Sequence, residues 1–352
     1  MKKMNVAIIG CGTIANSAHA PSYQKNPGAH IKYCVDIIPE RANALKDKFG
    51  GEVALTDYRE ILGDRELDAV SVCVPNYLHA PISIDCLNAG KDVLCEKPAA
   101  MNYAEALAMR DAAEKNGRIL NIGVVNRFNT AVNRIRDLAE RGELGEIYHV
   151  YCSFRAYRSI PGLGGPFTTK ALSGGGVLID WGVHFLDLIF YVLGTPKPVS
   201  VTGATYSKLA RNLREYAYLD MWAGPPDYSG VNDVEEFVTG MVRTQSPTIT
   251  LNGAWAQNIN EPAMFIEFLG DKGGVKLQYG GGYTMWSARD GELCEHRPVF
   301  KSSDMFYDEI DAFLESAREG RKIRSNIDYV LPVAQVMDAL YESAREGREV
   351  VL

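Results

Sequence analysis

Short apolar runs alternate with amphipathic stretches over the first third of the chain. Residues 4–9 form a mostly apolar run rich in β-branched side chains, which is typical of a buried parallel strand. Similar runs at 31–35, 52–55, 69–74, 92–95 and 119–125 alternate with helical patterns at 39–49, 58–62, 80–89 and 103–116. This alternation predicts a doubly wound parallel sheet, whose ligands bind beyond the carboxyl ends of its strands.

The pattern changes after Asn126. A helix is predicted at 130–141 and a strand at 147–157, and strand-like runs follow at 236–243, 248–256, 263–269 and 273–278. Helices at 304–319 and 327–346 complete the chain. We therefore expect an α/β Rossmann domain over residues 1–125 and an α+β domain with a large, mostly antiparallel open sheet over 126–352. The least regular stretch, 207–232, is rich in aromatic residues and is either a lid over a ligand or a subunit contact.

A glycine-rich turn follows the first predicted strand directly. Gly10, Gly12 and Ala15 have the Gly-x-Gly-x-x-Ala spacing of a dinucleotide-binding turn. The first glycine permits a tight turn, the second lets the backbone approach a pyrophosphate, and the alanine lets the next helix pack closely. The amides at the N-terminus of that helix would bind phosphate oxygens. The turn therefore predicts a bound dinucleotide.

An acid ends the second predicted strand. Asp36 lies at about the interval where dinucleotide-binding folds place their ribose-binding carboxylate. A carboxylate accepts hydrogen bonds from a ribose diol and repels a 2′-phosphate, and Ile37 and Ile38 offer no compensating charge. Arg41, further along the next helix, could still reach a phosphate, and Asp36 could instead cap the helix that begins at Pro39. We expect NAD rather than NADP.

Two reactive side chains suit the oxidation of a secondary alcohol. That reaction needs a base for the hydroxyl proton, a hydride acceptor, and a group that stabilises charge on the oxygen. Lys97 follows a predicted strand, and His184 lies one turn after Asp180 on the same face of a predicted helix at 177–193. A neighbouring carboxylate orients an imidazole and makes it a better base. The three glycines at 174–176 allow the backbone to approach closely, and because no second histidine has ligand spacing we expect no metal.

Composition and charge restrict the class of protein. The 352 residues suffice for two domains, and a hydrophobic content of 46% with 33 glycines suits a packed, loop-rich protein. The net charge is −7, and residues of both signs are distributed along the chain without a basic cluster. Nucleic acid and anionic membranes are therefore not expected partners. Seven cysteines without CxxC spacing indicate free thiols in a reducing compartment. Residues 1–4 lead straight into the first strand and no apolar stretch is expected to span a bilayer, so we predict a cytoplasmic protein.

Four motifs occur in order along the chain. They are Gly10-Cys11-Gly12-Thr13-Ile14-Ala15, then Val74-Pro75-Asn76 with His79, then Glu96-Lys97-Pro98, and finally Gly174-Gly175-Gly176 followed by Asp180, Gly182, His184 and Asp187. Together they resemble the glucose–fructose oxidoreductase, inositol dehydrogenase and rhizopine-catabolism family (Gfo/Idh/MocA) over nearly the whole chain. The resemblance implies a Rossmann domain, an α/β domain whose sheet often forms an oligomer interface, and NAD(P)-dependent oxidation or reduction of a sugar, polyol or glycoside hydroxyl.

The resemblance also implies roles for individual residues. The catalytic group would be Lys97, Asp180 and His184. The cofactor would be bound by Gly10, Gly12, Thr13, Ile14, Asp36, Pro75, Asn76, His79, Glu96, Lys97 and Asn126. Relatives often have a cis peptide before the proline of the Glu-Lys-Pro tripeptide, and often have a tryptophan near the nicotinamide at the position of Phe167. Asp187 would orient His184 or join its helix to neighbouring backbone.

Substrate recognition is expected from basic and aromatic side chains. The candidates are Arg127, Arg155, Tyr157 and Arg158, together with His184. Arginine side chains could bind a carboxylate, a phosphate or several sugar hydroxyls, and one or two of these arginines could instead pair with surface acids. The substrate class therefore remains a sugar, polyol or glycoside.

Three functions are compatible with these residues. The first is a NAD-dependent dehydrogenase that acts on a ring hydroxyl, with a homo-oligomeric quaternary structure. The second is a glycosidase or lyase that retains NAD and oxidises C3 transiently so that a substituent is eliminated. The third is a non-catalytic sensor that binds NAD, which ranks last because such relatives usually lose the lysine or the histidine.

Overall fold

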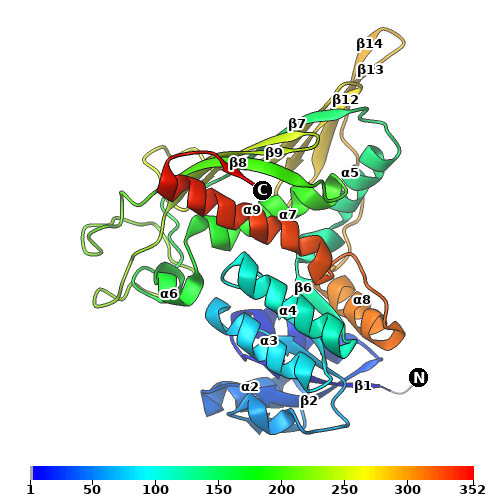
Figure 1. The fold of residues 1–352 in the computed structure, drawn as a ribbon, viewed down its shortest axis with the longest axis vertical. Coiled ribbons are helices and arrows are strands. Elements are labelled where there is room, and N and C mark those ends of the chain that lie inside the picture. Colours follow the sequence, from blue (N-terminus) through cyan, green and yellow to red (C-terminus); the bar gives the residue numbers. More distant parts are fainter. Residues whose placement is uncertain (1–2) are drawn as a thin grey trace. The chain divides into compact units, whose positions relative to one another are not determined.

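The computed structural model describes residues 3–352 and divides them into two compact units (Figure 1). The first unit contains the described residues up to Phe128 and also Ser303–Leu331. The second contains Asn129–Ser302 and Pro332–Leu352. Near its C-terminus the chain thus returns to the first unit. A division of the chain at residue 125 alone does not describe this return.

The first unit is built on a six-stranded sheet in the order β3-β2-β1-β4-β5-β6. Every neighbouring pair is parallel, so the predicted doubly wound sheet is confirmed. The strands are β1 (Met4–Ile9), β2 (Ala29–Val35), β3 (Val53–Leu55), β4 (Ala69–Val72), β5 (Asp92–Glu96) and β6 (Leu120–Gly123). All residues of β4, β5 and β6 are buried, because parallel strands are covered on both faces.

Helices cover this sheet. The longer ones are α1 (Ala20–Lys25), α2 (Pro39–Phe49), α3 (His79–Asn88), α4 (Tyr103–Asn116) and α8 (Met305–Glu319). Side chains of α1, α2 and α8 share one hydrophobic cluster with β1 and β2, while α3 and α4 lie side by side (Figure 1). The 3₁₀ turns are η2 (Tyr58–Ile61), η3 (Asn76–Leu78) and η4 (Val125–Phe128), and a π-turn, η1, occupies Ala15–His19. Residues 58–62, predicted as a helix, therefore form a 3₁₀ turn.

The second unit is built on a nine-stranded sheet in the order β14-β13-β12-β11-β7-β10-β9-β8-β15. Only β7 and β10 pair in parallel, so the predicted mostly antiparallel sheet is confirmed. The strands are β7 (Ile147–Arg155), β8 (Pro198–Tyr206), β9 (Phe237–Thr244), β10 (Thr248–Ala254), β11 (Ala263–Gly270), β12 (Gly273–Gln278), β13 (Tyr283–Arg289), β14 (Glu292–His296) and β15 (Val350–Val351).

Helices pack on one face of this second sheet. They are α5 (Thr130–Glu140), α7 (Val183–Val192) and the part of α9 (Ile327–Glu346) that follows Leu331, and their apolar side chains share one core with the sheet. A short helix, α6 (Lys170–Ser173), follows the 3₁₀ turn η5 (Pro166–Thr168). The π-turn η6 (Leu178–Gly182) leads directly into α7.

One sequence-based expectation needs correction. Residues Lys170–Val192 are long and apolar enough to cross a membrane by length and composition, although we expected no such stretch. The segment is interrupted between α6 and η6, and 89% of its most apolar window is buried inside the protein. Its hydrophobicity is that of a core helix, which packs against the sheet.

Candidate active site

The glycine turn of the first unit begins where β1 ends. Gly10 has a φ of +91°, and a Cβ there would lie 2.3 Å from the carbonyl oxygen of Cys73, so only glycine fits. A Cβ on Gly12, in contrast, would meet no atom within 4 Å. Thr13 is exposed and Ile14 half-buried at the start of the helical segment that begins with η1. The open space beside Gly12 fits the approach of a pyrophosphate to the backbone.

Asp36 links the ends of the first two strands. Its Oδ2 accepts the backbone N–H of Cys11 at 2.8 Å, and its Oδ1 accepts the N–H of Ile38 at 2.9 Å. Helix α2 has Ile38 as its N-cap, without a side-chain cap, so Asp36 is not the N-cap residue. The adjacent Ile37 is 87% exposed and brings no charge. This acid beside the glycine turn suits a ribose diol and disfavours a 2′-phosphate.

The loop after β4 carries the second motif. Pro75 is exposed and precedes the turn η3, which begins at Asn76. The His79 ring is buried, with Nδ1 at 2.7 Å from the carbonyl oxygen of Pro98 and Nε2 at 2.9 Å from that of Val74. Burial lowers the pKa of His79, while the two carbonyl oxygens beside its ring nitrogens oppose that shift. His79 therefore joins two loops at strand ends, and a role toward the cofactor stays a prediction.

The Glu96-Lys97-Pro98 tripeptide follows β5, and its Lys97–Pro98 peptide is cis, as the family resemblance implied. Glu96 is buried, and its Oε2 accepts the backbone N–H of Lys97 at 3.1 Å. Nε2 of His19, a residue to which we assigned no role from sequence, lies 2.8 Å from its Oε1. Burial alone would raise the pKa of Glu96, but His19 and Lys97 hold that pKa below its ordinary value.

The loop after β6 places Asn126 and Arg127 in the turn η4, where both are buried. The guanidinium of Arg127 donates to the carbonyl oxygen of Tyr329 at 2.9 Å and to that of Arg324. These bonds tie η4 to the loop and helix that follow α8 within the first unit. They give Arg127 a structural role, and its predicted contact with substrate remains untested.

In the second unit, Asp180 and His184 lie on the continuous π- and α-helical segment formed by η6 and α7. Asp180 is in the π-turn itself, is 8% exposed, and accepts the indole N–H of Trp255 at Oδ2 over 3.3 Å. His184 is half-buried one turn later, and Asp187 is buried. Single π-turns inside helices are uncommon and occur frequently at functional sites.

The glycines before this helix contact protein atoms. A Cβ on Gly175 would lie 2.1 Å from the hydroxyl of Tyr341, and one on Gly176 would lie 1.9 Å from the carbonyl oxygen of Glu235. The buried Glu235 carboxylate accepts the N–H groups of Gly176 and Leu178 and the hydroxyl of Tyr341. Burial raises the pKa of Glu235, and burial with the nearby carboxylate raises that of Tyr341. Sequence reasoning missed both residues because neither belongs to a recognisable motif.

The remaining predicted substrate residues lie at and after the end of β7. Arg155 donates to the hydroxyl of Ser153 at 3.1 Å. Arg158 lies over the rings of Tyr157 and Tyr216 at 5.7 and 5.5 Å and donates to the side chain of Asn258. Arg158 thus contacts the irregular 207–232 stretch.

Phe167 contacts the same stretch through an aromatic pair. Its ring lies edge-on to Trp222, with the ring centroids 5.0 Å apart. Trp222 is 56% exposed. This aromatic pair therefore joins the turn η5 to the 207–232 stretch.

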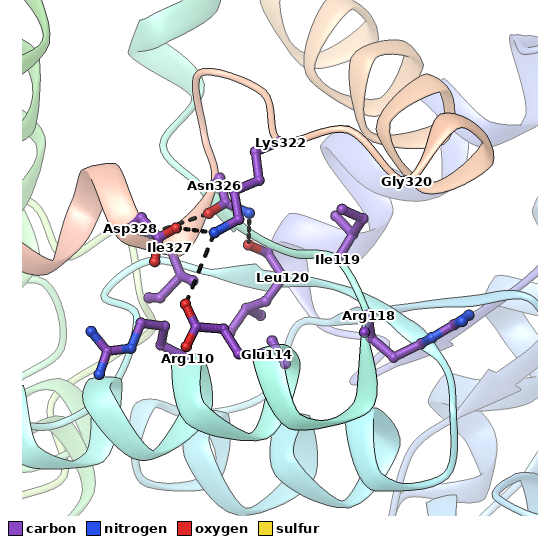
Figure 2. A pocket seen from close by; sticks show the side chains of 12 residues that line it. Arg110, Glu114, Arg118, Ile119, Leu120, Gly320, Lys322, Asn326, Ile327 and Asp328 are labelled. Carbon is purple, nitrogen blue, oxygen red and sulfur yellow. Dashed lines mark hydrogen bonds and ion pairs between the residues drawn. The ribbon is translucent and has the colours of Figure 1, made fainter.

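A separate surface cavity of about 210 Å³ lies in the first unit (Figure 2). It is lined by α4, the start of β6, the loop after α8 and the start of α9, and Lys322 pairs there with Glu114 and Asp328. Its strand residues are at the amino end of β6, whereas parallel sheets bind ligands at the carboxyl ends of their strands. The cavity is therefore not the dinucleotide site. Among residues 3–352, no group of three or more His, Cys, Asp or Glu side chains is arranged to hold a metal ion.

Comparison with known families identifies both parts of the chain. Residues 4–124 match the model described as an oxidoreductase family with a NAD-binding Rossmann fold. Residues 132–276 match the Gfo/Idh/MocA C-terminal domain. The chain belongs to the Gfo/Idh/MocA family. It is thus an oxidoreductase that uses NAD, and the enzyme and cofactor predictions are confirmed.

Individual relatives are enzymes of carbohydrate oxidation. The D-glucoside 3-dehydrogenase of Escherichia coli is 36% identical over 278 residues, which is 78% of this chain and 77% of the relative. The aldose-aldose oxidoreductase of Caulobacter crescentus, solved with glycerol, has a TM-score of 0.82 and 26% identity over the full length of both chains. A levoglucosan dehydrogenase solved with NADH and levoglucosan has a TM-score of 0.87 and 21% identity over 99% of both chains, which shows a shared fold.

Proposed function

We propose that this Gfo/Idh/MocA oxidoreductase oxidises a secondary hydroxyl of a sugar, polyol or glycoside, and that a glycoside is its natural substrate. The observation that carries the proposal is a buried carboxylate, Asp180, one helical turn before a half-buried imidazole, His184, on a chain that also retains Lys97. The glucoside-oxidising relative supports the choice of a glycoside.

The chain offers residues suited to hold the cofactor. Gly10 and Gly12 would receive the pyrophosphate, Asp36 would bind the ribose diol, and the strand-end residues Asn76 and Glu96 would border the rest of the dinucleotide. When bound, NAD supplies the acceptor for the hydrogen that leaves the carbinol carbon. The chain itself must therefore remove the hydroxyl proton and stabilise charge on the oxygen.

We assign these tasks to three side chains. His184 takes the hydroxyl proton at an imidazole nitrogen, as a general base. Asp180 orients that imidazole and stabilises its protonated form, while its own position is set by the Trp255 indole. Lys97 places a positive charge near the hydroxyl oxygen as it loses its proton.

Variants of the two reactive residues test this assignment. Lys97→Ala or His184→Ala is expected to lower kcat by roughly 10²- to 10⁴-fold, because each removes a charge-stabilising or proton-transferring group. Initial rates of NADH formation are measured on a panel of sugars, inositols and glucosides, and NAD affinity is measured by calorimetry. His149→Ala, whose ring bonds Thr248 and Thr250 on the second sheet, is the matched control. Near-normal rates in both variants with an intact fold would sink the assignment.

Product analysis separates this reaction from the NAD-retaining alternative. A dehydrogenase accumulates NADH and a keto product in stoichiometric amounts. A glycosidase or lyase that oxidises C3 transiently would cleave the glycosidic bond without net NADH. Mass spectrometry of the products together with the absorbance of NADH distinguishes the two.

We also propose a cytoplasmic homo-oligomer that associates through the second sheet. Alternation along β7 buries Val150 and Cys152 in the core, so Tyr151 faces the opposite side, where its ring meets Phe265 edge-on at 5.6 Å. Such half-buried aromatic side chains suit a subunit contact. Light scattering of Tyr151→Glu tests the oligomer, since an unchanged mass would contradict it, and cell fractionation tests the location.

A further inference from the structure

One residue holds three consecutive amides at the start of the His184 helix. The Gly176 N–H donates to Oε2 of Glu235 at 2.9 Å, and the Leu178 N–H donates to its Oε1 at 3.0 Å. Between them, the Val177 N–H donates to the Glu235 carbonyl oxygen at 3.1 Å. The first amides of a helix have no partner within the helix. Glu235 therefore caps this helix from a distant part of the sequence.

Tyr341 on α9 fixes the carboxylate that forms this cap. Its hydroxyl donates to Oε1 of Glu235 at 2.8 Å, so the carboxylate receives three hydrogen bonds. The close contacts of Gly175 with the Tyr341 hydroxyl and of Gly176 with the Glu235 carbonyl leave no room for a Cβ at either position. Two glycines of the run are thus required by contacts with protein atoms.

Glu236, the next residue in the sequence, is linked to Asp180 through Trp255. The Glu236 carbonyl oxygen accepts the backbone N–H of Trp255 at 2.9 Å. The indole N–H of Trp255 in turn donates to Asp180. Residues 235 and 236 therefore hold the helix backbone before Asp180 and, through Trp255, the Asp180 side chain.

The turn that these contacts hold is the π-turn η6. Asp180 lies inside the π-turn η6, and His184 lies in the α-helix that follows. A π-turn contains more residues per turn than an α-turn, and successive α-helical positions differ by about 100° around the axis. Residues four apart share a face of an α-helix, so relaxation of η6 to α-helical geometry would leave Asp180 near that face but would shift it around and along the helix axis relative to His184. Core packing of α7 fixes the later side of the turn, and the Glu235 cap fixes the earlier side.

We propose that Glu235 and Tyr341 are positioning residues for the reaction, which they serve by fixing the backbone turn that sets the position of Asp180 relative to His184. This inference rests on the proposed function of His184. Neither residue is assigned contact with substrate or cofactor. Their loss is therefore expected to lower turnover while NAD affinity, a property of the first unit, is retained.

Tyr341→Phe is the main test, because it removes one hydroxyl and keeps the ring that packs in the core. We expect kcat to fall about tenfold, which corresponds to the loss of one hydrogen bond to a charged group. Glu235→Gln is expected to lower kcat up to about 100-fold, since an amide NH₂ would face a backbone N–H and displace the turn. KM for the best substrate of the panel above and Kd for NAD should change less than threefold, a rough bound for binding steps that these residues do not touch.

Ser343→Ala provides the matched control on the same helix. Ser343 accepts the Gly203 N–H at 2.9 Å and donates to the Arg348 carbonyl at 2.6 Å, so the variant loses comparable bonds away from the glycine run. If Tyr341 only stabilises the fold, Tyr341→Phe and Ser343→Ala will lower Tm and kcat alike, and the proposal is overturned. The pH profile of kcat/KM should also shift in Tyr341→Phe and stay unchanged in Ser343→Ala.

The outcomes separate this inference from the proposed function. If His184→Ala is inactive and Tyr341→Phe is fully active, the positioning role fails and the catalytic assignment stands. If His184→Ala is fully active, the catalytic assignment fails and the positioning role fails with it. Should Glu235→Gln not fold, as judged by Tm and NAD binding, Tyr341→Phe alone decides.

Discussion

The two glycine runs of this protein look alike in sequence but face different surroundings. In the first unit, a Cβ on Gly12 would meet no atom within 4 Å. In the second, Cβ atoms on Gly175 and Gly176 would lie about 2 Å from Tyr341 and Glu235 atoms. Gly12 leaves room for a ligand, whereas Gly175 and Gly176, like Gly10 in the first run, admit neighbouring protein atoms. A glycine pattern therefore indicates that something approaches the backbone closely. It does not indicate whether a ligand or another part of the protein does so.

Two buried glutamates, one in each unit, also differ in their surroundings. Glu96 in the first unit is bonded to His19 and lies near the Lys97 charge, and its pKa is lowered despite burial. Glu235 in the second unit receives only neutral donors, and burial raises its pKa. Neutral donors satisfy the oxygens of a buried carboxylate but compensate its desolvation less than a cation does. The first glutamate is thus held ionised, and the second is held chiefly as a cap.

The largest expected effect comes from Gly176→Ala. The new Cβ would collide with backbone of Glu235, which cannot move without releasing the helix cap, so we expect about 3 kcal/mol of lost stability in the second unit. Urea unfolding followed by fluorescence measures this loss, and NAD binding reports on the first unit. An unfolding free energy equal to that of the unsubstituted protein would remove the distinction between the two glycine runs.

Gly12→Ala is the counterpart in the first unit. Because open space surrounds the position and its φ is not in the left-handed region, the unfolding free energy should change by less than about 0.5 kcal/mol. NAD affinity should fall at least about tenfold, since the methyl group would occupy the approach to the pyrophosphate. Calorimetric titration with NAD checks this. An unchanged Kd would mean that the turn does not approach the cofactor.

The two glutamates should respond to pH in opposite directions. The stability contributed by Glu96 is present above the ordinary glutamate pKa of 4.5 and is lost as the pH falls through its lowered pKa in the folded protein. Glu235 binds a proton more readily when folded, so its contribution weakens as the pH rises from 4.5 through its raised pKa. For each of Glu96→Gln and Glu235→Gln, we measure the difference in unfolding free energy from the unsubstituted protein as a function of pH on both sides of 4.5. The two differences should change with pH in opposite directions. Parallel slopes would show that the two environments are equivalent.

The smallest expected effect concerns Trp222, which lies outside the helix cap. Loss of its edge-on contact with Phe167 should raise KM for an aryl glucoside by a few-fold up to about tenfold, the worth of one aromatic pair, with kcat and Tm nearly unchanged. Steady-state kinetics of Trp222→Ala measures this. Trp286→Ala on β13, whose indole is likewise partly exposed, is the control and should leave KM unchanged. Equal effects in the two variants would contradict a ligand role for the 207–232 stretch.

Local patterns were enough to predict most of the fold. Helices α2, α4 and α9 were predicted with the bounds that the structure has, because turn residues, caps and periodicity coincide there. Strands β13 and β14 were missed, since their exposed, polar residues lack clear alternation. The return of α8 to the first unit was also missed. Its apolar face shows that it packs, but periodicity does not identify the sheet against which a helix packs.

The sequence by itself determined the family, the parallel and antiparallel sheets, the NAD-binding turn and the candidate residues Lys97, Asp180 and His184. These features depend on neighbours in the chain, whose spacing fixes which side chains share a turn or a strand end. Only the tertiary structure decided that Glu235 and Tyr341 meet at the start of the His184 helix. In the sequence, Glu235 lies 59 residues after Gly176, and Tyr341 lies 106 residues after Glu235. Such contacts arise from the packing of distant segments, so no local period or spacing encodes them.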